Sequence, residues 1–340
     1  MRPVRDLPHV ANCFAMQRRP LLLSAFLVAA GAWAGSLHAQ TAWPSQTVKI
    51  VVPTGAGSSL DLIVRLLSDK LAARWRQAVV VDNKPGAGGL LGVDIAAKAS
   101  DNHTIAIGFN GPLAYAPFLY SKTPYDPAKD LRPIVMTSSQ ANVLAINAEK
   151  VPAKTLPEFV AWAKAQDGKM NFSSLGQGSS AHMTMELFLA ETGIKAVHVP
   201  FNGSPPAAMA VAQGTVDATW MVAPALLPHV QSGKVRLLAV SADNKPAGLQ
   251  DLPSMRELGY PAVKALAWNG LVGPASMSDA AVARINADVN DLLHDTAVRD
   301  AMARSGLTVV GGSAEAFRQF IADDVARWGP VITKLGVKLN

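Results

Sequence analysis

The residues best placed to bind a charged ligand lie in glycine-rich turns that join strands to helices. The first turn reads Pro53-Thr54-Gly55-Ala56-Gly57-Ser58-Ser59-Leu60-Asp61. Ser58 is suited to cap the helix that follows, and Asp61 three residues later completes a capping box. Such a turn presents free backbone N–H groups and the positive end of a helix dipole, which favour an anion. We expect the N–H groups of Ala56, Gly57 and Ser58 to hold a carboxylate, while Asp61 fixes the loop.

Two further turns are predicted to approach the same anion from the opposite side. Gly176-Gln177-Gly178-Ser179-Ser180 begins a helix with His182 in its first turn, and Phe201-Asn202-Gly203 follows the next strand. We expect Ser179, His182 and the Asn202-Gly203 turn to close over the ligand. A histidine in this position is either a ligand-facing donor or a half-buried helix residue, and the sequence fits both.

Enzymatic motifs are absent from the sequence. It contains no G-x-S-x-G elbow, H-E-x-x-H pair or P-loop, and no G-x-G-x-x-G turn with a downstream acid for a ribose. We therefore predict no catalytic residue, no metal and no cofactor. The enzymatic alternative is a periplasmic hydrolase that uses His182 with Ser179 or Ser180.

The elements that position these turns alternate between strand and helix patterns, which predicts an α/β fold with mostly parallel sheets. The expected strands span 47–52, 78–82, 103–109, 134–137, 143–147, 171–175, 196–200, 216–222, 235–241 and 267–272. Ligands in such sheets bind at the carboxyl ends of strands. The candidate ligand-binding residues are therefore Pro53, Thr54, Ala56, Gly57, Ser58, Asp61, Phe109, Asn110, Gly176, Ser179, His182, Phe201, Asn202 and Gly203.

The chain begins with a predicted secretory signal. Arg18-Arg19 precede an apolar run over 21–34, and Leu37-His38-Ala39 resembles a cleavage site, so residues 1–39 are expected to be removed. The run is shorter than the ~20 residues that a membrane span needs. Met16 is an alternative start, and the arginine pair is compatible with twin-arginine export as well as the general route. We expect a soluble periplasmic protein that begins at Gln40.

Charge argues against a nucleic-acid partner, and cysteine content argues against a disulfide. Without the leader the chain carries 27 basic and 24 acidic residues, and no Lys/Arg cluster marks a nucleic-acid face. The single cysteine, Cys13, lies in the leader, so no disulfide is expected in the mature protein. We predict a monomer held by its cores, without a nucleic-acid partner.

In order and spacing, several of these stretches resemble the substrate-binding proteins of tripartite tricarboxylate transporters, the TctC or Bug family. The stretches are Pro53–Gly57 with Asp61, Asn83–Gly89, Pro124–Leu131, Gly176–Ser179 with His182, Val199–Gly203 and Gly214–Asp217. The resemblance covers essentially the whole mature chain. The sequence departs from the family at Phe201-Asn202-Gly203, where Tyr-Lys-Gly is usual, and at Ser58-Ser59, where glycine and a polar residue are common.

The resemblance implies a type II periplasmic-binding fold, with two lobes and a hinge between them. We expect one lobe from 40–140 plus 264–340 and the other from 141–263, with hinge motion near residues 140 and 265. The family implies that loop N–H groups, hydroxyls and waters hold a small carboxylate, without an arginine clamp.

The predicted function is capture of a small organic acid for membrane transporter subunits. Dicarboxylates, tricarboxylates, amino acids and aromatic acids are all compatible with these turns. A ligand-sensing partner of a membrane kinase is an alternative.

Overall fold

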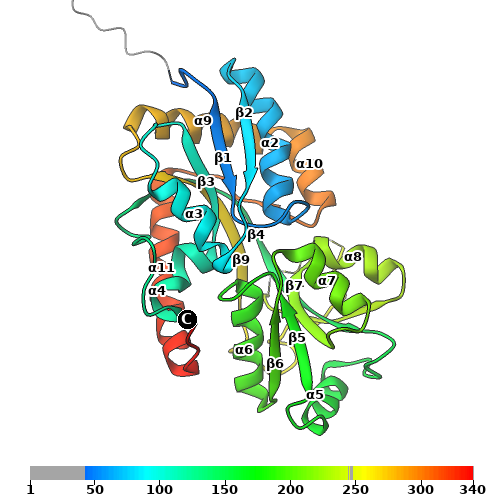
Figure 1. The fold of residues 1–340 in the computed structure, drawn as a ribbon. Helices are drawn as coiled ribbons and strands as arrows, with labels where there is room; N and C mark the ends of the chain where they lie inside the picture. The colour runs from blue at the N-terminus through cyan, green and yellow to red at the C-terminus, as the bar shows by residue number, and fades with distance from the viewer. Residues whose placement is uncertain (1–42, 244, 246–247, 340) are drawn as a thin grey trace, which may run out of the picture. The chain divides into compact units, whose positions relative to one another are not determined.

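The structure is a computed structural model that describes residues 43–339 except 244, 246 and 247. The predicted signal segment 1–39 therefore lies outside the described residues. The described chain is an α/β protein with two lobes, as predicted (Figure 1).

The first lobe is built on a sheet with helices on both faces. Its strands are β1 (Val48–Val52), β2 (Val79–Asn83), β3 (Thr104–Phe109), β10 (Thr308–Val309) and parts of β4 (Leu131–Asn147) and β9 (Leu266–Pro274). Its helices are α2 (Ser59–Trp75), η1 (Ala87–Gly89), α3 (Leu90–Ala97), η2 (Gly111–Tyr115), α4 (Ala116–Leu119), α9 (Asp279–His294), α10 (Thr296–Arg304) and α11 (Ala314–Leu335).

Alternation along β1 explains how this sheet is covered. Ile50 and Val52 pack with α2, α9 and α10 on one face. Val51 points the other way and packs with α3, α4 and α11, since successive strand residues face opposite sides. β1 is parallel to β2 and β3, so the carboxyl ends of these strands meet at one edge.

The second lobe repeats this layered arrangement. It contains β5 (Met170–Ser174), β6 (Ala196–Pro200), β7 (Ala218–Val222), β8 (Val235–Val240) and the second part of β4. Its helices are α5 (Leu156–Ala165), α6 (Ser180–Thr192), α7 (Ser204–Ala212) and α8 (Ala223–Gln231). Helices α5 and α6 share one core with the sheet, and α7 and α8 share another.

Strand β4 connects the two lobes. Its residues Leu131–Ala141 pair with β9, and Asn142–Ile146 pair with β7. All antiparallel pairings among the described strands involve β4 or β9. The parallel pairings are those of β1 with β2 and β3 and of β5 with β6 and β7. The sequence predicted two separate strands here, at 134–137 and 143–147, and the structure shows one continuous strand.

Candidate functional site

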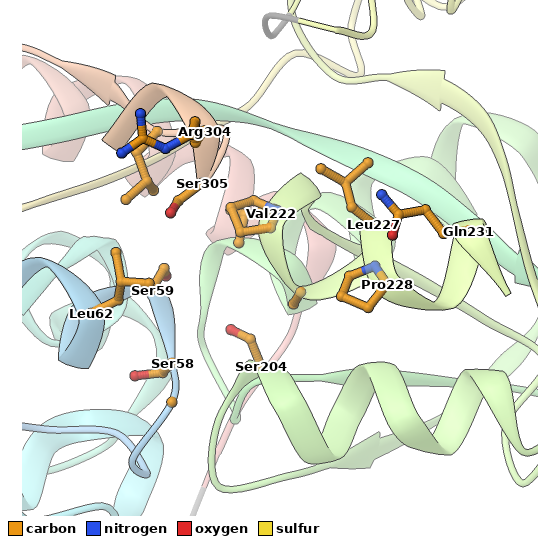
Figure 2. A pocket seen from close by; sticks show the side chains of 14 residues that line it. Ser58, Ser59, Leu62, Ser204, Val222, Leu227, Pro228, Gln231, Arg304 and Ser305 are labelled. Atoms are coloured by element: carbon orange, nitrogen blue, oxygen red, sulfur yellow. The ribbon is translucent and has the colours of Figure 1, made fainter. Parts of the chain in front are cut away.

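The candidate site is a cavity of about 310 Å³ at the amino-terminal end of α2. Its wall combines residues of both lobes, and Figure 2 shows their side chains around it. The lining residues are Gly57, Ser58, Ser59, Leu62, Ser204, Val222, Pro224, Ala225, Leu227, Pro228, Gln231, Arg304, Ser305 and Leu307. Of the predicted ligand-binding residues, Gly57 and Ser58 line it.

Three helices begin at the wall of this cavity. Ser58 caps α2, Gly203 precedes α7 and Val222 precedes α8. Because the first N–H groups of a helix have no partner within it, this wall offers backbone donors and positive partial charge, although Pro205, Pro206 and Pro224 supply no N–H. The arrangement favours a ligand with a negatively charged group.

Ser204 adds a side-chain donor to this wall. It is only 3% exposed and lines the cavity, where Figure 2 shows its side chain on the side opposite Arg304 and Ser305. Its hydroxyl forms no hydrogen bond with the residues that the structure describes, and it is not one of their buried atoms that lack a partner, so it opens to the cavity. An accessible hydroxyl without a protein partner can donate a hydrogen bond to a ligand oxygen.

The first turn, Pro53–Asp61, is held by its own hydrogen bonds. The Ser58 hydroxyl accepts a hydrogen bond from the Asp61 N–H at 3.3 Å, which confirms the predicted cap. In a capping box the Asp61 carboxylate would accept from the N–H of the cap residue Ser58. Here it accepts instead from the N–H of the preceding residue, Gly57, at 2.9 Å. The Ser58 N–H donates to the Gly55 carbonyl at 3.3 Å. Two of the three N–H groups expected to hold the carboxylate, those of Gly57 and Ser58, are therefore engaged within the turn in this structure.

Asp61 anchors the turn to its surroundings, as expected. It is 3% exposed, and besides Gly57 its carboxylate accepts hydrogen bonds from Asn83 at 2.9 Å and Arg65 at 3.0 Å. Burial alone would raise the pKa of Asp61, but the hydrogen bonds from Arg65, Gly57 and Asn83 together lower it. Thr54 contributes a further bond, 2.6 Å between its hydroxyl and that of Ser58.

The facing turn, Phe201–Gly203, touches the first turn directly. The Gly55 N–H donates to the Asn202 carbonyl at 3.1 Å. A β-carbon at Gly203 would lie 3.5 Å from the Gly55 nitrogen, and one at Gly176 would lie 3.7 Å from the Phe201 carbonyl oxygen. The structure therefore brings together Pro53–Ser58, Gly176 and Phe201–Gly203, with Asn202 contributing its carbonyl.

Ser179 and His182 are directed into the second lobe. Ser179 is fully buried and caps α6 by accepting the His182 N–H. His182 is 3% exposed; its Nδ1 accepts from the Gly178 N–H at 3.1 Å, and its Nε2 lies 3.3 Å from Glu186. In this structure both side chains are engaged in fixing the turn and neither lines the cavity, so their closing over the ligand stays a prediction.

The same geometry bears on the hydrolase alternative. The Ser180 hydroxyl accepts a hydrogen bond from Asn142 at 2.7 Å, and the Ser179 hydroxyl accepts a backbone N–H. Among the described residues, neither serine forms a hydrogen bond with the His182 ring. The arrangement thus lacks the contact through which a histidine activates a serine.

Phe109 and Asn110 also belong to packing and not to the cavity wall. Phe109 is 5% exposed and packs in the core that β1 shares with α2 and α9, with its ring against Gly89. The Asn110 amide donates to Tyr115, to Asp324 and to the Leu266 carbonyl, and its oxygen accepts from the Trp268 N–H. Burial raises the pKa of Asp324, against the hydrogen bonds from Trp268 and Asn110. Asn110 therefore ties β3 to β9 and α11.

The comparison with protein families decides the identity of the chain. The profile of the family described as "Tripartite tricarboxylate transporter family receptor" matches residues 63–337. The chain belongs to this family. The resemblance inferred from the turns is thereby confirmed.

Relatives and solved structures agree with this assignment. The chain is 34% identical over 327 residues to Protein BugT of Bordetella pertussis, covering 96% of this chain and 99% of BugT. A protein from R. palustris solved with adipate superposes with a TM-score of 0.83 at 28% identity, over 87% of this chain and 100% of that one. MatC from Rhodopseudomonas palustris, with bound malate, gives 0.81 at 28% identity, over 85% and 100%.

Sequence reasoning missed much of the cavity wall of this receptor. Helix α8 was not predicted, because Pro228 lies inside it and proline normally interrupts a helix. A signal was present at its start, where Pro224 follows a strand and suits the first helical turn. Arg304, Ser305 and Leu307 carry no local signal of a site, because they reach the cavity only through the packing of α10.

The described part of the receptor contains neither a metal-binding cluster nor a membrane-spanning helix. Among residues 43–339, apart from the three positions left out, no group of three His, Cys, Asp or Glu residues could hold a metal ion. Over the same range, none of the helices has the length and apolar character required to cross a bilayer.

Proposed function

We propose that this receptor captures a small organic acid in the periplasm and presents it to the membrane subunits of a tripartite transporter. The observation that carries the proposal is the Ser204 hydroxyl, which opens to the cavity without a protein partner beside three helix starts. A carboxylate supplies the acceptors that Ser204 and these N–H groups lack. The adipate and malate of the two structural neighbours are both small carboxylates.

In the proposed mode, the carboxylate binds between Ser204 and the first turn. Ser59, Gly57 and the start of α8 complete this part of the wall, and Asp61 keeps the turn in shape without touching the ligand. A volume of about 310 Å³ lies at the small end of ligand sites in proteins, which fits a small acid. No covalent step is proposed, and the receptor acts as a soluble monomer.

We further propose that ligand binding closes the lobes 40–140 plus 264–340 and 141–263 about a hinge near residues 140 and 265. Support comes from β4, which changes partners between Ala141 and Asn142. Small-angle scattering should show a smaller radius of gyration with saturating ligand. An unchanged radius contradicts closure.

Calorimetric titration with succinate, malate, adipate and their diamides tests the proposed function. We expect acids to bind and diamides to fail. Ser204→Ala should weaken acid binding about tenfold, since a hydrogen bond to a charged group contributes roughly 1.5–3 kcal/mol. Ser232→Ala is the matched control, because Ser232 is exposed at the end of α8 and outside the cavity.

The outcomes separate the function from the site. If none of the acids binds, the proposed function is wrong. If acids bind equally well to Ser204→Ala, the function stands and the assignment of the cavity is wrong. Mass spectrometry of the incubated acids should show no product, and a new product would favour an enzyme.

A further inference from the structure

Arg304 places a positive charge on the cavity wall. It is the last residue of α10, lines the cavity and is exposed. No carboxylate lies within ion-pair distance of it among the residues that the structure describes, whereas Arg65 pairs with Asp61 and Arg74 with Asp288. Arg304 therefore lines the cavity without a counter-ion among the described residues.

The cavity wall carries Ser204 and Arg304 on opposite sides and apolar residues elsewhere. Figure 2 shows Arg304 and Ser305 on the side opposite Ser204. Leu62, Leu227 and Leu307 contribute apolar surface to the wall, and Leu62 is 38% exposed although it is a large apolar side chain. Such a wall accommodates a ligand whose hydrocarbon body separates two charged groups.

We infer that Arg304 binds a second anionic group of the ligand and makes the receptor select acids charged at both ends over acids charged at one end. This inference rests on the proposed function, in which Ser204 and the helix starts hold the first carboxylate. A guanidinium can donate two parallel hydrogen bonds to a carboxylate, so it distinguishes a charged end from a neutral amide of the same size.

A structural role for Arg304 makes a different prediction. A basic residue in the last turn of a helix interacts favourably with the negative end of the helix dipole. If this were its only role, replacing Arg304 would lower the melting temperature and leave ligand preference unchanged. Binding and stability must therefore be measured on the same samples.

The test compares adipate with its monoamide, which keeps the length and loses one charge. Calorimetric titration should show that the wild-type receptor binds adipate at least about tenfold more tightly. Arg304→Gln should lose about tenfold in adipate affinity and keep its affinity for the monoamide within about twofold, so that the preference disappears. Arg299→Gln is the matched control, since it removes the same charge from the same helix outside the cavity.

Each other outcome overturns the inference. If the wild-type receptor does not prefer adipate over its monoamide, or if Arg304→Gln keeps that preference, Arg304 does not bind a second charged group. A variant that loses adipate and monoamide equally means that Arg304 holds the carboxylate common to both. If neither the wild-type receptor nor Ser204→Ala binds any of the acids, the proposed function itself is wrong.

Discussion

Two turns of the molecule have the same local structure and different surroundings. In the first, Pro53–Asp61, Ser58 accepts the backbone N–H of Asp61; in the second, Ser174–His182, Ser179 accepts that of His182, both at 3.3 Å. The side chain of the third helical residue then accepts the N–H of the glycine before the cap. The bond is 2.9 Å from Gly57 to Asp61 and 3.1 Å from Gly178 to His182.

The surroundings decide which turn faces a ligand. Gly57 is exposed at the cavity, and a β-carbon there would meet nothing closer than Pro205 at 3.7 Å. Gly178 is buried, and a β-carbon there would lie 2.7 Å from Leu119 of α4. The capping pattern therefore predicts a rigid turn at both places, but only tertiary packing determines whether that turn is open.

The largest effect that separates the two turns is expected from alanine at the glycines. Both have positive φ, +78° at Gly57 and +70° at Gly178, so alanine costs about 1 kcal/mol at each. Gly178→Ala adds the overlap with Leu119 and should cost about 3 kcal/mol in total. Urea unfolding measures both variants, with Gly57→Ala as the matched control. Equal losses would contradict the difference in packing.

The local parts of this site could be predicted from sequence, and the non-local parts could not. Both caps depend on residues at most four positions apart, so Ser58 and Ser179 were recognised. The polar stretch Ser138–Asn142 does not look like part of a buried strand, so the continuity of β4 was not predicted. The buried amide of Asn142 is tolerated there because it donates a hydrogen bond to Ser180 of the distant helix α6 at 2.7 Å. Arg304 reaches the cavity through the packing of α10 beside α2, which no local pattern records.

A second prediction concerns acid, which should affect the second turn at higher pH than the first. The Ser174 hydroxyl lies 2.7 Å from Nε2 of His198, whose ring stacks on His182 at 3.9 Å. Burial and then the neighbouring His182 lower the pKa of His198 to about 3. Between about pH 6.5 and about pH 3 the unfolded chain therefore binds a proton that the folded chain does not. The free energy of unfolding should therefore decrease as the pH is lowered through this range.

His198→Gln tests this dependence while keeping a partner for Ser174. Denaturant unfolding across that range should show a shallower fall for the variant, by at most about 1.4 kcal/mol per pH unit. Carboxylates titrate alike in both proteins at the acid end, so they cancel in the comparison. Parallel curves would mean that His198 takes up its proton in the folded state as it does in the unfolded chain.

The smallest effect is expected from Asp61→Asn in the first turn. The amide keeps one oxygen for the Gly57 N–H but loses the charge that faces Arg65, so we expect a loss of about 1 kcal/mol at pH 7. Because the pKa of Asp61 is lowered in the folded protein, its charge contributes stability above about pH 3.8, and this contribution is lost as pH falls through the folded pKa. The difference in the free energy of unfolding between variant and wild type should therefore shrink below about pH 3.8.

Asp69→Asn is the control for Asp61→Asn, because it removes the same charge from an exposed position of the same helix, and it should show no such loss. Acid affinity should fall less than with Ser204→Ala, since Asp61 shapes the turn without touching the ligand; a larger fall would place Asp61 itself in contact with the bound acid.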